Sequence, residues 1–148
     1  MKKFSALLCG AVLAISATAS ATVPDSEIGL GSAQPGMSTD KLIEVYGQPL
    51  QKHGDNWIYE HFTVEIDDDS PNVVEKVVTY SNQIGTPSDV KVGQDTSVLI
   101  SAFGNPDEVD EDKEDNEVEY KYFNSNRTMK MEFKIVNNAI TKIICKLK

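Results

Sequence analysis

The chain has little cysteine. Of its 148 residues only two are cysteines, Cys9 and Cys145. Cys9 lies within an apolar N-terminal stretch that we expect to be cleaved off, so that Cys145 would remain as the single thiol. One thiol cannot form an internal disulfide, and we therefore expect the fold to depend on packing alone. Cys145 alternates with Ile143 and Leu147 along an apolar segment, which predicts a buried, unreactive thiol.

Recognisable catalytic motifs are also missing from the sequence. It has no G-x-S-x-G motif, no glycine-rich phosphate loop with a lysine, and no cysteine and histidine arranged for nucleophilic catalysis. The sequence therefore predicts a protein that is not an enzyme, with no catalytic residue and no cofactor.

Histidine occurs only twice, at His53 and His61. Neither belongs to an H-E-x-x-H motif, and a zinc site would need a third ligand, so we predict no metal site. Two acidic stretches, residues 67–69 and 107–119, leave an alternative open, because calcium binds several carboxylates in one loop. Both stretches lack the glycine and the closing glutamate of an EF-hand, and we expect residues 108–116 to form a solvated loop.

Only one long apolar run is present. It extends from about Phe4 to Ile15, follows two lysines, and ends in the small residues Ala19-Ser20-Ala21. This layout predicts a signal peptide over residues 1–21. The run is too short to span a bilayer, which needs about 20 residues. We therefore expect an exported protein, periplasmic or extracellular, with no integral membrane segment.

Positive charge is in short supply, because 14 basic residues are set against 23 acidic ones, a net charge of -9. Removal of the signal peptide would leave 12 basic residues and a net charge of -11. A surface of this sign repels the phosphates of nucleic acids and anionic lipid headgroups. We therefore expect neither as a partner.

What the sequence does contain is an internal repeat. GMSTDKLIEVYGQP, residues 36–49, aligns without gaps to GQDTSVLISAFGNP, residues 93–106. In each copy a helix-capping side chain, Ser38 or Asp95, precedes an apolar i, i+3, i+4 face, and a glycine, Gly47 or Gly104, follows it. Each copy therefore predicts a helix of about two turns, too short to be stable without docking.

Strands are expected after each helix. In the first half they cover residues 57–62, 63–67 and 73–81, and in the second half residues 119–123, 128–136 and 139–147, where apolar and polar side chains alternate. The predicted fold class is α+β: two tandem helix-plus-three-strand repeats form an antiparallel sheet, with the helices packed on one face. Repeat one covers residues 22–83 and repeat two residues 84–148, and a mature chain of this length favours one shared core.

The shared pattern resembles a known group of proteins. The string G-x-[ST]-x-x-x-[LV]-x-x-x-[YF]-G-x-P, the pair Trp57-x-Tyr59 and the closing segments VVEKVV and AITKII are similar to the SmpA/OmlA family and to the tandem-repeat β-lactamase-inhibitor-protein fold. The resemblance implies an exported, non-catalytic, protein-binding scaffold. SmpA/OmlA members are lipoproteins and the inhibitor has disulfides, whereas this chain has neither a lipobox nor the cysteines to pair.

Aromatic residues supply the candidate binding site. Trp57, Tyr59 and His61 alternate on one face of a predicted strand, and Tyr120 and Tyr122 occupy the matching positions of repeat two. If the helices cover this face the aromatic residues belong to the core, and if they do not, the residues form an exposed platform for a partner. We predict an exported, non-catalytic binding module that contacts an unidentified envelope or extracellular protein. The alternative is an envelope protein that binds calcium or a transition metal.

Overall fold

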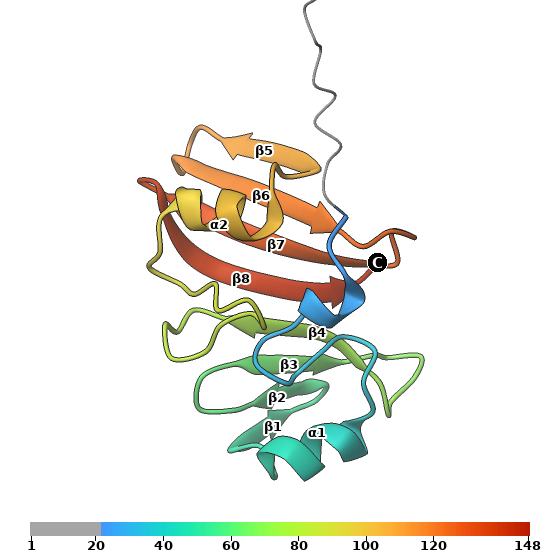
Figure 1. Ribbon diagram of the computed structural model, residues 1–148. Coiled ribbons are helices and arrows are strands. Elements are labelled where there is room, and N and C mark those ends of the chain that lie inside the picture. The colour runs from blue at the N-terminus through green and yellow to red at the C-terminus, as the bar shows by residue number, and fades with distance from the viewer. Residues whose placement is uncertain (1–21) are drawn as a thin grey trace, which may run out of the picture.

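The computed structural model describes residues 22–148, which form one eight-stranded sheet, two short α-helices and one short 3-10 helix (Figure 1). The signal peptide predicted for residues 1–21 lies outside the described residues. Neighbouring strands of the sheet are antiparallel throughout. No helix in the described part of the chain is long and apolar enough to cross a membrane.

The elements follow one another in the same order in both halves, one α-helix and then four strands. The first half contains η1 (Asp25–Glu27), α1 (Thr39–Tyr46), β1 (Gln51–His53), β2 (Asn56–Ile58), β3 (Thr63–Ile66) and β4 (Val74–Thr79). The second half contains α2 (Thr96–Phe103), β5 (Glu108–Asp112), β6 (Glu117–Phe123), β7 (Met129–Val136) and β8 (Ala139–Leu147). The strand order is β1-β2-β3-β4-β8-β7-β6-β5, so β4 and β8 join the halves at the centre of the sheet.

Both α-helices begin and end where their sequences require it. The Ser38 side chain accepts a hydrogen bond from the Lys41 amide at 3.1 Å, and the Asp95 carboxylate accepts one from the Ser97 amide at 2.8 Å. These bonds satisfy amides that a helix start leaves without a partner. Gly47 and Gly104 end the helices at φ angles of 78° and 75°, which glycine adopts without steric cost.

The start of each helix and the segment before it are held by corresponding hydrogen bonds. The amides of Gly36 and Gly93 donate to the carbonyls of Val74 and Ile140, both at 2.7 Å, and those of Thr39 and Thr96 donate to the carbonyls of Asn72 and Asn138, at 2.9 and 3.3 Å. Each helix is therefore tied to the last strand of its own half.

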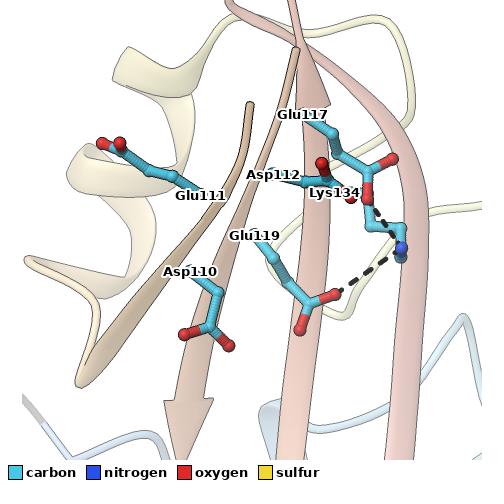
Figure 2. Close-up of a pocket in the computed structure, with 6 residues that line it drawn as sticks. All are labelled: Asp110, Glu111, Asp112, Glu117, Glu119 and Lys134. Carbon is cyan, nitrogen blue, oxygen red and sulfur yellow. Dashed lines mark hydrogen bonds and ion pairs between the residues drawn. The ribbon is translucent and has the colours of Figure 1, made fainter. Parts of the chain in front are cut away.

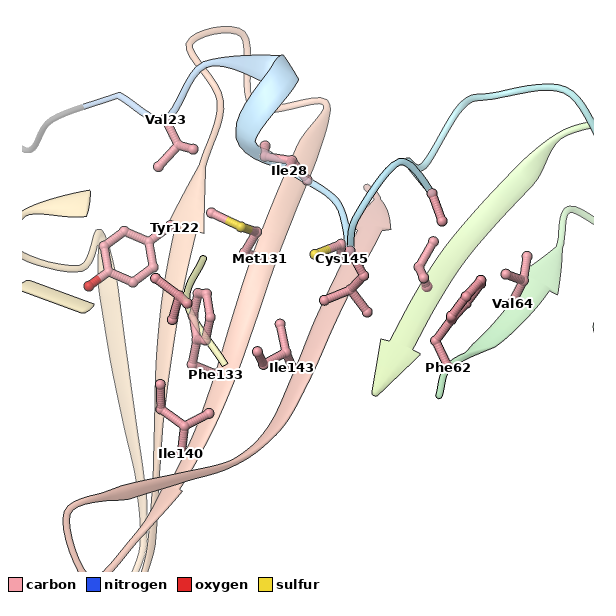
Figure 3. Packing of buried hydrophobic residues seen from close by; sticks show 14 of the residues in the cluster. Val23, Ile28, Phe62, Val64, Tyr122, Met131, Phe133, Ile140, Ile143 and Cys145 are labelled. Carbon is pink, nitrogen blue, oxygen red and sulfur yellow. The ribbon is translucent and has the colours of Figure 1, made fainter. Parts of the chain in front are cut away.

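The core lies between the sheet and its two helices, and it extends across both halves. One row of facing residues crosses the sheet from β2 to β6: Trp57, Val64, Val77, Cys145, Met131 and Tyr122. Leu42 of α1, and Leu99 and Phe103 of α2, belong to the same buried cluster. Figure 3 shows this continuity, from Tyr122 and Phe133 through Cys145 to Phe62 and Val64. In the described part of the chain, both halves therefore contribute residues to one continuous core.

Both ends of the described chain meet the turn between β6 and β7. The Val23 amide donates to the Phe123 carbonyl at 3.3 Å, and the Lys148 amide donates to the Thr128 carbonyl at 2.9 Å. Figure 1 shows the start of the blue segment and the C-terminus on this side of the molecule.

The prediction of two helix-plus-three-strand repeats is wrong. Each half contributes four strands, and the molecule is dominated by its sheet, with α-helices of only eight residues each. The strands that were missed are the edge strands β1 and β5. All their residues are exposed, so no alternation of buried and solvated side chains marks them. Exposed charges on edge strands also discourage pairing with other chains.

Candidate binding pocket

An open pocket of about 400 Å³ lies beside the C-terminal end of α1. Its walls come from α1, from the β2–β3 turn and from the segments that precede the two α-helices. The lining residues are Gly31, Tyr46, Tyr59, Glu60, His61, Phe62, Gln83 and Ile84. Pockets of this size that combine aromatic side chains with a few polar groups are typical binding sites.

Three aromatic rings form one wall of this pocket. Phe62 stacks on Tyr59 with the ring centroids 4.8 Å apart, and the Tyr46 ring meets Phe62 edge-on at 4.9 Å. The Tyr59 hydroxyl donates to the Gly47 carbonyl at 3.0 Å, which closes the end of α1. Burial raises the pKa of Tyr59, which favours the protonated hydroxyl that makes this bond. The wall is rigid, because each ring is held by another ring or by the backbone.

The loop before α1 approaches the same wall closely. The Ser32 amide donates to the Tyr46 hydroxyl at 2.8 Å. At Gly31, where φ is +56°, a Cβ atom would lie 2.5 Å from that hydroxyl oxygen. Only glycine fits there, for both steric and conformational reasons. Gly31 therefore allows the loop and the end of α1 to enclose one side of the pocket.

The rim of the pocket carries its ionisable groups. The Glu60 side chain is 80% exposed and the His61 side chain 40%, and the His61 Nε2 atom lies 3.9 Å from a Glu60 carboxylate oxygen. Thr79 of β4 donates its hydroxyl to the His61 carbonyl at 2.6 Å, which fixes the backbone of the turn. The rim thus presents a carboxylate and an imidazole on an anchored turn, above an aromatic wall.

The five residues proposed from the sequence are spread over both halves of the molecule. Tyr59 and His61 line the pocket. Trp57 is half-buried on β2, with the Lys52 ammonium 4.0 Å from the ring centroid. Tyr120 is half-buried on β6, and Tyr122 is fully buried, with its hydroxyl 3.0 Å from the Gly104 carbonyl. The structure therefore brings Tyr59 and His61 together in one pocket but does not bring Tyr120 or Tyr122 to it.

Sequence reasoning missed most of the pocket. Tyr46 and Phe62 were visible as helix-face and strand residues, but nothing local indicated that they meet. Gly31 and Ile84 come from the two segments that precede the helices, and only the folded chain places them side by side. The positive φ angle of Gly31 indicates why a glycine is needed there, but this angle is known only from the structure.

The opposite face of the sheet is charged. A shallow pocket of about 210 Å³ is lined by five acidic residues and Lys134. Figure 2 shows Lys134 beside Glu117 and Glu119. The Lys134 ammonium lies 2.7 Å from Glu117 and 3.8 Å from Glu119. The hydrogen bond to Glu117 raises the pKa of Lys134, so the ammonium stays charged. Lys134 thus supplies the positive charge that these carboxylates require.

The acidic stretches do not converge on a metal site in the part of the chain that the structure describes. Within residues 22–148 no group of three or more histidine, cysteine or acidic side chains is placed to hold an ion. His53 instead contacts the Gln51 side chain at 3.0 Å, and the amides of Asp69 and Ser70 donate to Asp67. Residues 108–112, predicted as part of a loop, form strand β5.

Ion pairs continue across this face. Glu132, only 8% exposed, lies 2.6 Å from Lys130 and 3.6 Å from Lys146. Burial alone would raise the pKa of Glu132, but the hydrogen bond from Lys130 and the charge of Lys146 outweigh it and lower the pKa. The charges on this face are therefore largely paired within the molecule.

The architecture is a sheet-dominated fold, with one eight-stranded antiparallel sheet and two short α-helices. No family model and no curated protein sequence matches it. Among solved structures it is similar to a DUF4309 family protein (YjgB) from Bacillus subtilis, with a TM-score of 0.52 and 13% sequence identity, over 86% of this chain and 88% of that one. At this identity the likeness shows the fold alone. The resemblance to the SmpA/OmlA and β-lactamase-inhibitor proteins stays a prediction.

Proposed function

We propose that this chain is an exported, non-catalytic binding module that contacts another protein of the cell envelope through the pocket beside α1. The observation that carries the proposal is the open pocket lined by the half-buried Tyr46 and by the packed rings of Tyr59 and Phe62, which are 8% and 7% exposed. Aromatic side chains held in place before binding lose little entropy when a partner docks, and they are frequent anchors of protein interfaces.

The surrounding chemistry supports binding rather than catalysis. The Tyr59 hydroxyl is engaged with a backbone carbonyl, and the described residues that line the pocket include no serine, cysteine or lysine nucleophile. Cys145 is fully buried, and burial raises the pKa of its thiol, which opposes formation of a thiolate. The pocket therefore has the means to hold a side chain but no evident group to transform it.

The charge distribution favours the helix side of the molecule as the contact surface. On the other side of the sheet, Lys121, Lys134 and Glu132 each have an opposite charge within hydrogen-bond distance. A partner docking there would have to displace or desolvate these pairs, which costs free energy. The pocket beside α1 requires no such displacement.

Affinity capture tests the proposal. The protein as processed by its host would be immobilised and exposed to native envelope and culture fractions, and bound proteins would be identified by mass spectrometry at two salt concentrations. We expect one dominant partner that survives the higher salt, because the contact is largely apolar. Gln83→Arg, which places a long side chain at the pocket, is expected to abolish capture.

Gln48→Arg is the matched control, because Gln48 is exposed and does not line the pocket. The same change in charge and length at this position should leave capture intact. Recovery of background proteins only would contradict the proposed function. Equal loss of the partner with both variants would show that the added charge, and not the pocket, is responsible.

A further inference from the structure

The Glu60 carboxylate at the rim of the pocket differs from most carboxylates on the sheet. Glu119 and Glu132 each lie within about hydrogen-bond distance of a lysine, at 3.3 and 2.6 Å. The one basic side chain within 4.0 Å of Glu60 among the described residues is His61, at 3.9 Å, and the Glu60 side chain is 80% exposed. A carboxylate without a lysine or arginine partner therefore lines the same pocket as the three aromatic rings.

Elsewhere the molecule already contains an arginine placed between an aromatic ring and a carboxylate. The Arg127 guanidinium lies 3.9 Å from the centroid of Phe123, and one of its nitrogens lies 3.1 Å from Glu108. This arrangement combines a cation–π contact with an ion pair. In this protein, an arginine side chain thus contacts an aromatic ring and a carboxylate at the same time.

The first half has no arginine at the corresponding place. Arg127 lies in the turn between β6 and β7. In this hairpin Tyr120 pairs with Phe133. In the corresponding hairpin of the first half Trp57 pairs with Val64, so fewer residues separate the paired positions and the turn is shorter. The short β2–β3 turn carries Glu60, His61 and Phe62 and no basic residue other than the histidine. The Glu60 carboxylate is therefore left without an arginine or lysine partner, next to the packed ring of Phe62.

We infer that the pocket beside α1 takes a lysine or arginine side chain of the partner, with its methylene stem against Tyr46 and Phe62 and its charged head at Glu60. The inference rests on the proposed function and names the chemistry of the partner. The net charge of -9 complements a basic partner and would speed its approach. The Tyr46 hydroxyl, which accepts from Ser32, still has a proton to donate to a carbonyl of the bound segment.

An NMR titration with single capped amino acids tests this inference. ¹H–¹⁵N spectra of the protein would be recorded with N-acetyl-arginine amide, N-acetyl-lysine amide, N-acetyl-norleucine amide and N-acetyl-glutamate amide. The two basic compounds are expected to shift the amide signals of Gly31, Glu60 and Ile84. Norleucine amide, which has the stem without the charge, should bind several-fold more weakly, and glutamate amide should not bind.

Glu60→Gln isolates the role of the carboxylate. We expect it to weaken arginine amide binding about fivefold, the effect of an exposed ion pair of about 1 kcal/mol, and to leave norleucine amide binding unchanged. Glu114→Gln removes the same charge from an exposed turn of the second half and should have no effect. Equal binding of norleucine and arginine amides, or no effect of Glu60→Gln, would overturn the inference.

Two further outcomes would also overturn it. Shifts confined to residues 107–119 would mean that the basic compounds only bind the acidic stretch nonspecifically. Concentration-dependent shifts at the pocket without any added compound would identify a second copy of this chain as the occupant. The proposed function is judged separately by capture. A partner that Glu60→Gln binds with the same affinity as the wild type refutes the basic side chain alone, whereas failure to capture any partner refutes the binding module.

Discussion

Val78 of β4 lies directly opposite Ile144 of β8 at the centre of the sheet. The two residues occupy the same position in the matching segments NVVEKVV and NAITKII. On either side of this pair, Val77 faces Cys145 and Thr79 faces Ile143, so the contacts are reciprocal. A local two-fold axis therefore passes between the halves, as it does between subunits of a symmetric dimer.

The continuous core predicts that the two halves unfold together. Leu99→Ala in α2 removes a fully buried side chain and should lower the free energy of unfolding by about 2–5 kcal/mol. Trp57, the only tryptophan, lies in the first half and would report the loss through its fluorescence. Fluorescence and circular dichroism should give the same urea midpoint, and Leu42→Ala should behave in the same way. Two separate transitions would show that the halves are independent.

Glu132 should make stability depend on pH. Its pKa lies below the ordinary value of 4.5 in the folded protein, so its contribution is present above pH 4.5 and is lost as the pH falls through the lowered value. At pH 7, Glu132→Gln should cost about 1.5–3 kcal/mol, the range for hydrogen bonds to charged groups. The difference from wild type, measured by urea unfolding, should shrink below pH 4.5. Glu114→Gln serves as the control, and a difference that does not change with pH would contradict this account.

Calcium should not stabilise the wild-type protein through the acidic pocket. The Lys134 ammonium already lies among its carboxylates, 2.7 Å from Glu117. Millimolar calcium is therefore expected to leave the melting temperature unchanged. Lys134→Met removes the competing charge, and calcium should then raise the melting temperature by about 2–5 °C if it stabilises the fold by about 1 kcal/mol. A calcium-dependent rise in the wild type would support the ion-binding alternative.

The hydroxyls of Tyr59 and Tyr122 should stabilise the two helix ends to similar extents. Each donates to the carbonyl of the glycine that ends its helix, at 3.0 Å in both halves. Tyr59→Phe and Tyr122→Phe should each lower the free energy of unfolding by about 0.5–1.5 kcal/mol, because each leaves a carbonyl without its donor. Thermal unfolding would measure this. Tyr80→Phe, at a residue that is largely exposed, is expected to have no effect.

The helices could be predicted from the sequence because their signals are local. Ser38 and Asp95 cap the first turns, and Gly47 and Gly104 end the helices at positive φ, all within a single stretch of chain. The strand count could not be predicted in the same way. Asp110 lies on β5 because the backbone there pairs with β6, and Lys121 of β6 binds its carboxylate at 2.5 Å. No periodicity in the sequence relates these residues.

The candidate site was only partly predictable for the same reason. Tyr59 and His61 were found because aromatic and polar side chains stand out within one short segment. The other walls of the pocket come from distant parts of the chain: Gly31 precedes α1 and Ile84 precedes α2. These segments come together only because β4 and β8 pair and join the two halves of the sheet, which is a property of the whole fold.

The position of the chain ends has a consequence for connectivity. Val23 and Lys148 both bond to the β6–β7 turn, while the connection between the halves runs through the exposed residues Pro87 and Ser88. A circular permutant that joins residue 148 to residue 22 through a short linker and opens the chain at this connection would keep every strand pair. The two halves could therefore follow each other in either order along the chain and still pack through β4 and β8.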